Sequence, residues 1–295
     1  MRAKPTQETL ILGIPKGSLE SSTLDLFARA GYNLQVRQRS YMVTFDDDRI
    51  SGRMFRAQEM SRYVESGVVD AGLTGLDWIQ ENDSQVVQIS ELVYSKQSLA
   101  PVRWVLAVPE ESTVQKVEDL EGGIIATELV NVSRRFFASR GVNVRVEFSY
   151  GTTEAKARLL DGIVDVTETG SSLRENGLRI IETIMASSTR FIANKQAMQI
   201  PWKRQKVENI ALLLQGAIDG RMKVGLKMNV RRSDLQAVQG LLPAEKSPTV
   251  SSLMDEQWVA LEVIVDERIE RDLVPQLKRA GAQGIITYPL NKVIP

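Results

Sequence analysis

The residues best suited to chemistry lie between Asp161 and Gly177, where a predicted buried strand ends in small hydroxyl residues. The stretch reads Asp-Gly-Ile-Val-Asp-Val-Thr-Glu-Thr-Gly-Ser-Ser-Leu-Arg-Glu-Asn-Gly. Thr169-Gly170-Ser171-Ser172 is the predicted turn into a helix, and backbone N–H groups at such a turn bind anions. Two acids, Asp165 and Glu168, precede the turn. Phosphate on one side and acids on the other indicate a phosphorylated sugar whose hydroxyl groups must be held.

Each part of this stretch also has a simpler interpretation. Strand-to-helix turns rich in glycine and serine are common without any ligand. No Gly-Lys-Ser/Thr is present, so the turn is not a Walker loop. Asp165 fits a solvated strand end as well, and Asp70 stands at the equivalent place in the first half of the chain.

A second group of candidates surrounds the first predicted strand. Pro15-Lys16-Gly17-Ser18 follows that strand and opens a helix, so Lys16 is placed to neutralise a phosphate as a point charge. Thr74-Gly75 and the guanidinium of Arg56 supply further polar groups, although a solvated helix face explains the arginine better. Asp46-Asp47-Asp48 is a poor metal cluster, because adjacent strand residues point to opposite faces. We therefore interpret these three residues as a turn and assign no metal ligands from the sequence.

The composition limits the classes of function. The 295 residues predict two or three domains, and 43% hydrophobic with 25% charged residues are typical of globular proteins. A net charge of zero argues against broad binding to nucleic acid or to anionic membranes. Because the chain has no cysteine and no histidine, disulfides, Ser-His-Asp triads and most zinc sites are excluded. Chemistry must rely on Asp, Glu, Lys, Arg, backbone amides or a metal carried by the substrate.

The location follows from the same data. The first eight residues lack the apolar core of a signal peptide, and no apolar run approaches the length of a membrane span. We expect the protein to be located in the cytoplasm.

Strand-like and helix-like segments alternate through the first two thirds of the chain, which predicts parallel α/β sheets. The expected strands are residues 10–14, 32–36, 41–50, 68–73, 86–93, 102–108, 124–127, 142–148, 161–168, 180–185 and 190–193. The expected helices include residues 53–65, 112–120, 133–139, 153–160 and 202–218. The last of these has an apolar stripe formed by Val207, Ile210, Ala211, Leu214, Ala217 and Ile218.

An internal repeat indicates two similar lobes. Residues 67–75 align with residues 162–170 at a constant offset of 95, and both copies end in Thr-Gly. A second pair, residues 31–36 and 141–146, supports the same division. Because ligands of open α/β sheets bind at the carboxyl ends of strands, we expect a cleft between the lobes.

The remaining residues predict a small separate domain. Strand-like and helix-like segments follow in the order βαββαβ, which is the ferredoxin-like arrangement. Its last helix has a predicted apolar stripe of Ile269, Leu273, Leu277 and Ala280. Small domains of this shape often bind a regulatory ligand, by analogy of fold.

In several blocks of residues the chain resembles the long form of ATP phosphoribosyltransferase, the first enzyme of histidine biosynthesis. The resemblance extends over nearly the whole length, and the regulatory tail block distinguishes the long form from the short form. The matching blocks are residues 14–19, 63–67, 72–77, 161–178, 241–250 and 277–282. One departure concerns Arg-x-x-Asp-Ile-Pro of the family, where this chain has Arg56-Ala57-Gln58-Glu59-Met60-Ser61.

The resemblance implies a fold, an activity and partners. The fold is α/β, with two periplasmic-binding-protein-like lobes around a cleft and a C-terminal ferredoxin-like (ACT-like) domain. N1 of ATP attacks C1 of phosphoribosyl pyrophosphate and releases pyrophosphate, with Mg²⁺ carried largely by the substrate phosphates and histidine as feedback inhibitor. The resemblance also implies assembly as dimers that form hexamers. The expected domains are residues 1–99 with 190–219, residues 100–189, which bind the phosphoribosyl group, and residues 220–295.

The resemblance also assigns residues. Asp165, Glu168 and Lys16 are the expected catalytic residues. The residues expected to bind phosphoribosyl pyrophosphate are Asp165, Glu168, Thr169, Gly170, Ser171, Ser172 and Leu173. Those expected to bind ATP are Lys16, Gly17, Ser18, Arg56, Thr74 and Gly75, and those expected to bind histidine are Asn229, Thr249 and Ser252. An alternative of another class is a non-catalytic small-molecule-binding or sensor protein with the same two lobes.

Overall fold

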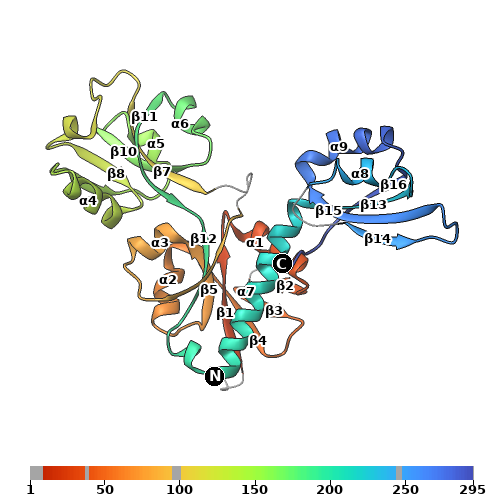
Figure 1. Cartoon of the computed structure of the whole chain (residues 1–295). Helices are drawn as coiled ribbons and strands as arrows, with labels where there is room; N and C mark the ends of the chain where they lie inside the picture. Colours follow the sequence, from red (N-terminus) through yellow and green to blue (C-terminus); the bar gives the residue numbers. More distant parts are fainter. Residues whose placement is uncertain (1–8, 37–39, 95–100, 244–247, 295) are drawn as a thin grey trace. The chain divides into compact units, whose positions relative to one another are not determined.

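The computed structural model describes residues 9–36, 40–94, 101–243 and 248–294 (Figure 1). The chain divides into two compact units, Met1–Ala28 with Tyr32–Ala211, and Arg29–Gly31 with Leu212–Pro295. Residues 1–8 and 244–247, on which part of the sequence interpretation rests, lie outside the described residues. Within the described residues, no helix combines the length and the apolar character needed to cross a membrane.

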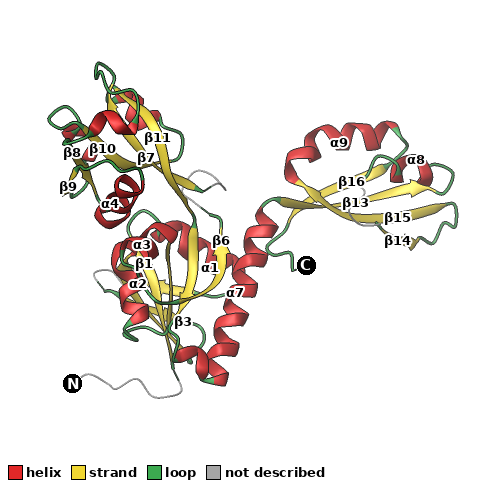
Figure 2. Ribbon diagram, turned by 60° about the vertical axis from the view of Figure 1, so that its left-hand side comes forward, coloured by secondary structure: helices red, strands yellow, loops and turns green. Residues whose placement is uncertain are grey.

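The first unit contains two α/β lobes, each built on its own sheet (Figure 2). The sheet of the first lobe has the strand order β2-β3-β4-β1-β5-β12-β6. Its strands are β1 (Leu10–Lys16), β2 (Leu34–Val36), β3 (Met42–Phe45), β4 (Ile50–Arg56), β5 (Ala71–Gly75), β6 (Val87–Leu92) and β12 (Thr189–Ala193). Its helices are α1 (Glu20–Ala30), α2 (Ala57–Glu65) and α3 (Leu76–Glu81).

The sheet of the second lobe has the strand order β11-β7-β10-β8-β9. Its strands are β7 (Val102–Pro109), β8 (Ile124–Thr127), β9 (Arg145–Phe148), β10 (Gly162–Thr167) and β11 (Leu178–Ser187). Its helices are α4 (Val130–Ser139), α5 (Thr153–Lys156) and α6 (Ser171–Glu175), with a 3₁₀ turn at Val117–Leu120. The prediction of two α/β lobes is confirmed.

The prediction of wholly parallel sheets is wrong, because both sheets are mixed. β1 runs parallel to β4 and β5, and β8 runs parallel to β10. β7 and β12 are antiparallel to their neighbours β10 and β5. The chain enters β7 from β6 and β12 from β11, so these strands arrive from the other lobe and not through a helix of their own lobe. A strand that arrives in this way need not run in the direction that a βαβ crossover imposes.

The predicted helix over residues 53–65 is also wrong in its first turn. Residues 53–56 belong to β4, where Gly52 and Met54 face the core and each residue has a register partner on β1. The helices predicted at residues 112–120 and 153–160 are shorter than expected, at Val117–Leu120 and Thr153–Lys156. Sheet pairing decided the first case, since a buried strand next to β1 satisfies its backbone better than an early helix start.

Helix α2 packs against the sheet through a close contact that two glycines permit. A Cβ atom at Gly13 or Gly72 would lie 2.3 or 2.7 Å from the sulfur of Met60. Glycine at these two positions on β1 and β5 therefore lets the fully buried Met60 reach the sheet backbone. The helix and the carboxyl ends of these strands keep a fixed spacing as a result.

The long helix α7 (Pro201–Arg221) follows β12 and a 3₁₀ turn at Ala197–Gln199. All six residues of its predicted stripe are buried, which confirms the predicted face. The two compact units divide within this helix, after Ala211.

The second unit contains the tail domain. Its strands are β13 (Lys223–Arg231), β14 (Thr249–Ser252), β15 (Trp258–Asp266) and β16 (Gln283–Pro289), and its helices are α8 (Leu235–Gln239) and α9 (Glu267–Arg279). The sheet order β14-β15-β13-β16, with antiparallel neighbours throughout, is that of a ferredoxin-like βαββαβ unit and confirms the prediction. In α9, Leu273 and Leu277 are buried, whereas Ile269 of the predicted stripe is 39% exposed because it lies in the first turn.

Candidate functional site

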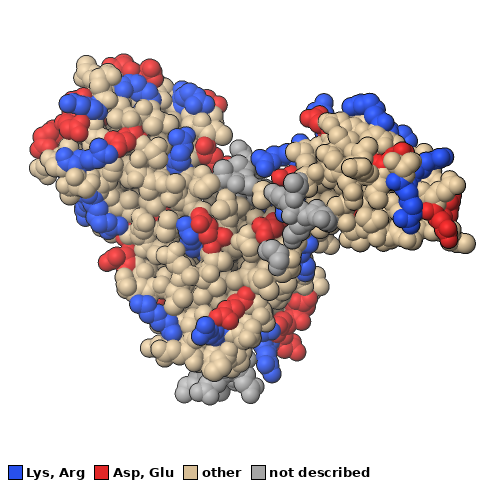
Figure 3. All heavy atoms as spheres, in the orientation of Figure 1, with Lys and Arg blue, Asp and Glu red and all other residues tan. Residues whose placement is uncertain are grey.

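A cavity of about 570 Å³ lies in the first unit, between the two lobes. Its size is that of a site for a nucleotide-sized ligand. The residues that line it come from both lobes: Lys16, Gly17, Ser18, Leu19, Arg56, Ala57, Gln58, Gly75, Asp77, Trp78, Val93, Tyr94, Val102, Trp104, Glu128, Asp165, Val166, Thr167, Glu168, Ser187, Ser188 and Thr189. Figure 3 shows basic and acidic side chains interspersed over one face of the molecule. Because this face has no surface of a single charge, the charges that select a ligand are those that line the cavity.

The first lobe contributes cations to the cavity. Lys16 and Arg56 are register partners at the carboxyl ends of the parallel strands β1 and β4, which brings their side chains to one edge. The Lys16 ammonium lies 4.2 Å from the ring centroid of Tyr41, a side chain that is 62% exposed. Such a contact at an exposed site is worth about 0.5–1 kcal/mol, so a phosphate group can readily compete for Lys16.

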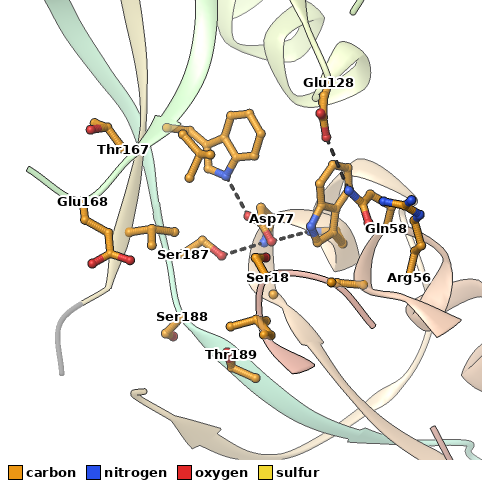
Figure 4. A pocket seen from close by; sticks show the side chains of 18 of the residues that line it. Ser18, Arg56, Gln58, Asp77, Glu128, Thr167, Glu168, Ser187, Ser188 and Thr189 are labelled. Carbon is orange, nitrogen blue, oxygen red and sulfur yellow. Dashed lines mark hydrogen bonds between the residues drawn. The ribbon is translucent and has the colours of Figure 1, made fainter. Parts of the chain in front are cut away.

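The second lobe contributes acids. Asp165 is on β10, and Glu128 follows the parallel neighbour β8, so both approach the cavity from one sheet edge. Burial, together with the nearby carboxylates of Glu154 and Glu128, raises the pKa of Asp165 to about 7, although a hydrogen bond donated by the Val166 N–H opposes this shift. Glu168 lines the cavity next to Thr167 (Figure 4).

Asp70, the repeat equivalent of Asp165, has a different environment. Its carboxylate forms an ion pair with Lys203 at 2.7 Å and accepts a hydrogen bond from the Ile11 N–H at 2.8 Å. Asp70 therefore has a structural role as a paired, largely buried acid, and not that of the solvated strand end considered from the sequence. Asp165 lines a cavity, and its pKa is raised because it is buried near other acids.

The turn predicted at Thr169–Ser172 is present between β10 and helix α6, and Gly170 adopts a φ of 77° in it. Its donors are partly engaged: the Gly170 N–H bonds to the Thr167 hydroxyl at 2.7 Å, and the Ser172 hydroxyl donates to Glu154 at 2.9 Å. The Gly170 N–H is therefore not open to a ligand. Leu173 is buried in the core, so only its backbone is available to a ligand.

The turn does not line the cavity, whereas its neighbours Thr167 and Glu168 do. Arg174, which sequence reasoning did not single out, donates to the Thr169 carbonyl at 3.4 Å. Its guanidinium lies 3.0 Å from where a Cβ at Gly170 would be. The Arg174 guanidinium is thus a cation close enough to the turn to neutralise a bound phosphate.

Thr74 and Gly75 differ in accessibility. Gly75 lines the cavity, but Thr74 is fully buried and its hydroxyl donates to the Ala57 carbonyl at 2.7 Å. The Thr74 hydroxyl thus connects β5 to the start of helix α2. Its assignment to ATP stays a prediction.

Sequence reasoning missed several residues of the cavity wall. Asp77 is 5% exposed, and its carboxylate accepts hydrogen bonds from the Trp104 indole at 2.7 Å and the Trp78 N–H at 2.9 Å. Burial raises the pKa of Asp77, although the hydrogen bonds oppose this shift. The internal repeat could have identified Asp77 as a candidate site residue, because it is the equivalent of Ser172 in the second copy. Gln58 and Glu128, whose side chains meet at 3.4 Å across the cavity, had no comparable signal (Figure 4).

The residues expected to bind histidine lie on the tail sheet but not on one face. Asn229 and Ser251 pair with opposite sides of Ala260, so Asn229 shares a face with Ser251 and therefore with Thr249. Ser252 pairs with the buried Val259, and its side chain belongs to the other face. The hydroxyl of Ser252 accepts a hydrogen bond from Arg232 at 3.4 Å.

The protein's own carboxylates offer limited support for a metal. The described residues contain no group of three or more Asp or Glu side chains arranged to hold an ion. Mg²⁺ in phosphate chemistry needs only one or two carboxylates, because substrate phosphates and water supply the other ligands. Asp165 and Glu168 fit this requirement.

Comparisons with known proteins cover nearly the whole chain. The sequence model of the family described as ATP phosphoribosyltransferase matches residues 56–216, and the one described as HisG, C-terminal domain, matches residues 221–292. An ATP phosphoribosyltransferase of Chlorobium luteolum is 58% identical over 98% of this chain and 99% of its own length. One of Solibacter usitatus is 55% identical over 97% and 99%.

A solved structure is similar as well. The ATP phosphoribosyl transferase (HisG:HisZ) complex from Thermotoga maritima contains a chain with a TM-score of 0.62 and 30% identity. The match covers 72% of this chain and 99% of that shorter one.

Proposed function

The chain belongs to the ATP phosphoribosyltransferase family, and we propose that its interlobe cavity is where N1 of ATP attacks C1 of phosphoribosyl pyrophosphate. The enzyme joins the two substrates into N1-(5-phosphoribosyl)-ATP and releases pyrophosphate. The observation that carries the location is the opposition of cations on one wall and acids on the other, at the carboxyl ends of strands from two sheets.

The reaction suits a protein without histidine. The adenine nitrogen is the nucleophile: the N1–C1 bond forms as the bond from C1 to the pyrophosphate oxygen breaks. Positive charge develops on the ribosyl ring in between, and the carboxylates of Asp165 and Glu168 stabilise it electrostatically. Most of the remaining rate enhancement comes from holding N1 and C1 in contact.

The cations serve the leaving group and the ATP phosphates. Lys16 and Arg56 are close enough to share one polyphosphate, because they occupy neighbouring strand ends. Gly17, Ser18 and Gly75 line the same wall and leave room for backbone approach. Mg²⁺, when bound to pyrophosphate, would neutralise charge on the leaving oxygens.

The turn at Thr169–Ser172 binds the sugar 5′-phosphate in this proposal. Support comes from its position directly after Glu168, from the left-handed Gly170 and from the adjacent Arg174. Phosphate must displace the Ser172 hydroxyl from Glu154, which frees that hydroxyl to donate to the ligand.

Histidine, assembly and location complete the proposal. We assign feedback histidine to the exposed sheet face of the tail that carries Asn229 and Thr249, and we expect homodimers that form hexamers. The name of the Thermotoga structure describes a complex, which supports assembly in the family. The substrates are metabolites of the cytoplasm, where we place the enzyme.

The test is incubation of the full chain with ATP, phosphoribosyl pyrophosphate and Mg²⁺, followed by absorbance of the adduct with and without histidine. We expect adduct and pyrophosphate in equal amounts, and less of both with histidine. A non-catalytic sensor with the same lobes would bind the substrates and form no adduct. Adduct formation without any effect of histidine would reject only the regulatory assignment.

A further inference from the structure

Helix α3 belongs to the first lobe by sequence, but much of its surface contacts the second lobe. It follows β5 directly, and its Trp78 packs against the second lobe's core cluster. The Trp78 and Trp104 rings meet edge to face with centroids 6.1 Å apart. The Arg135 guanidinium donates to the Gln80 carbonyl at 2.6 Å. Contacts of these kinds along one short helix join the two lobes on one side of the cavity.

The strongest of these contacts is a helix cap supplied from the other lobe. Helix α4 begins after Leu129, a residue that provides no side-chain cap for the first N–H groups. The Glu81 carboxylate takes that place, accepting hydrogen bonds from the N–H groups of Asn131 and Val132, each at 2.9 Å. Glu81 is only 9% exposed, and a carboxylate at a helix amino terminus is favourably placed with respect to the helix dipole.

This cap lies next to a residue of the cavity wall. Glu128 lies two residues before Val130, the first residue of α4, and the Leu129 N–H donates to the Thr127 hydroxyl at 3.0 Å. The position of Glu128 relative to the first lobe therefore depends on where Glu81 holds α4.

The other end of α3 contacts β7, the neighbour of the strand that bears Asp165. Asp77 accepts the Trp104 indole N–H, and the Asp77 N–H donates to the hydroxyl of Ser187, the last residue of β11 (Figure 4). Trp104 on β7 is the register partner of Val166 on β10, one residue beyond Asp165. The Asp77 carboxylate is thus two contacts away from the backbone of Asp165.

We propose that helix α3 is a fixed joint between the lobes, in which Glu81 and Asp77 are positioning residues that hold the ATP side and the phosphoribosyl side at the spacing required for attack. This inference rests on the proposed function of the cavity. The ATP phosphates bind to the first lobe, so a loosened joint leaves the affinity for ATP alone unchanged and lowers the rate at which N1 and C1 meet. A misplacement of about 1 Å costs on the order of a hundredfold in rate.

The test uses Glu81→Gln, which preserves the shape of the side chain but turns an amide NH₂ toward a backbone donor. We expect kcat to fall at least about tenfold, while the Kd of ATP alone stays within about twofold. Trp104→Phe removes the indole N–H that donates to Asp77. It should likewise lower kcat and leave the Kd of ATP unchanged. The matched control is Asp119→Asn, because Asp119 accepts two backbone N–H bonds, from Gln115 and Lys116, within the second lobe. The control should keep its kcat.

A structural readout separates the joint from the chemistry. The chain has no cysteine, so spin labels can be attached at Ser66→Cys in the first lobe and Ala138→Cys in the second, both exposed positions. The interlobe distance distribution should broaden with Glu81→Gln and not with Asp119→Asn.

Unchanged kcat or an unchanged distance distribution in Glu81→Gln would overturn the proposal. So would a loss of kcat that disappears at a temperature where the variant is fully folded, since that result indicates a role in stability alone. If the wild-type chain forms no adduct, the proposed function fails, whereas the distances still decide whether α3 holds the lobes together.

Discussion

At the scale of single residues, two equivalent aspartates show how environment determines chemistry. Asp70 and Asp165 occupy matching positions of the repeat, but Asp70 has the Lys203 ammonium beside it at 2.7 Å. Asp165 has the carboxylates of Glu154 and Glu128 nearby, and burial with these charges raises its pKa to about 7. An acid in this state changes charge near neutral pH, which suits a group that must meet a developing cation.

The first prediction concerns pH. If the charged form of Asp165 stabilises the ribosyl cation, kcat/KM should rise about tenfold per pH unit below pH 7 and level off above it, because its pKa is about 7. Asp165→Asn should remove this rise of kcat/KM with pH, which is the acidic limb of the profile, and should lower kcat about a hundredfold. Steady-state rates between pH 5 and 9 provide the measurement. Asp161→Asn, which changes an acid bonded to the Ile124 N–H outside the cavity, should keep the limb. A limb that persists in Asp165→Asn would assign the titration to another group.

The second prediction concerns the phosphate turn. Gly170→Ala places a Cβ at a φ of 77° and 3.0 Å from Arg174, which costs roughly 1–2 kcal/mol for the backbone alone. We expect the KM for phosphoribosyl pyrophosphate to rise about tenfold, with the KM for ATP unchanged. Gly177→Ala is the matched control, since Gly177 has a φ of 70° at the other end of α6. Equal effects of the two variants on both substrates would reject the turn as the phosphate site.

At the scale of elements, Ser61 shows why a departure from the family pattern is tolerated in helix α2. Where the family has proline, the buried Ser61 hydroxyl donates to the Trp78 carbonyl at 3.2 Å. It accepts hydrogen bonds from the Asn82 amide at 2.9 Å and the Ser84 hydroxyl at 3.0 Å. The serine therefore binds α2 to α3 and to the residues that follow it. This network holds one end of the helix that we identify as the interlobe joint.

The third prediction follows from this network. Ser61→Ala leaves the Asn82 amide and the Ser84 hydroxyl without this buried partner, so the free energy of unfolding should fall by about 1–3 kcal/mol. Urea unfolding followed by circular dichroism measures the change. Ser66→Ala at the end of the same helix removes an exposed 3.4 Å bond to the Tyr63 carbonyl and should change the free energy of unfolding little. Equal stability of the two variants would show that the Ser61 network contributes nothing.

At the scale of the whole molecule, the tail is a complete fold of its own. Its four strands have the ferredoxin-like order, and they enclose a core against α8 and α9. The end of the chain returns to the second half of α7, where the Val293 N–H donates to the Gly216 carbonyl at 2.8 Å. A truncation after Gly220 therefore removes packing from α7 as well as the predicted sensor.

The fourth prediction concerns that sensor. Truncation after Gly220 should abolish histidine inhibition and retain catalysis, and Asn229→Ala should do the same without disturbing α7. Ser252→Ala, on the other face of the sheet, should leave inhibition intact. Rates of adduct formation across a histidine titration provide the measurement. Full histidine sensitivity of the truncated enzyme would place the inhibitor site outside the tail.

The sequence by itself determined the features that depend on local order. The succession of strands and helices, the turn before α6, the repeat with Thr-Gly endings and the βαββαβ tail all follow from periodicity and turn chemistry. The apolar stripe of α7 was predictable for the same reason, since burial repeats with the helical period.

Only the tertiary structure decided what depends on neighbours distant in sequence. Residues 53–56 form a strand because they pair with β1. Asp165 and Asp70 differ in environment because Asp165 has carboxylates nearby and Asp70 has the Lys203 ammonium. The tertiary structure also brought Glu81 to the start of α4, 50 and 51 residues later in the chain. Desolvation, ion pairing and capping across lobes act through space, so no spacing along the chain encodes them.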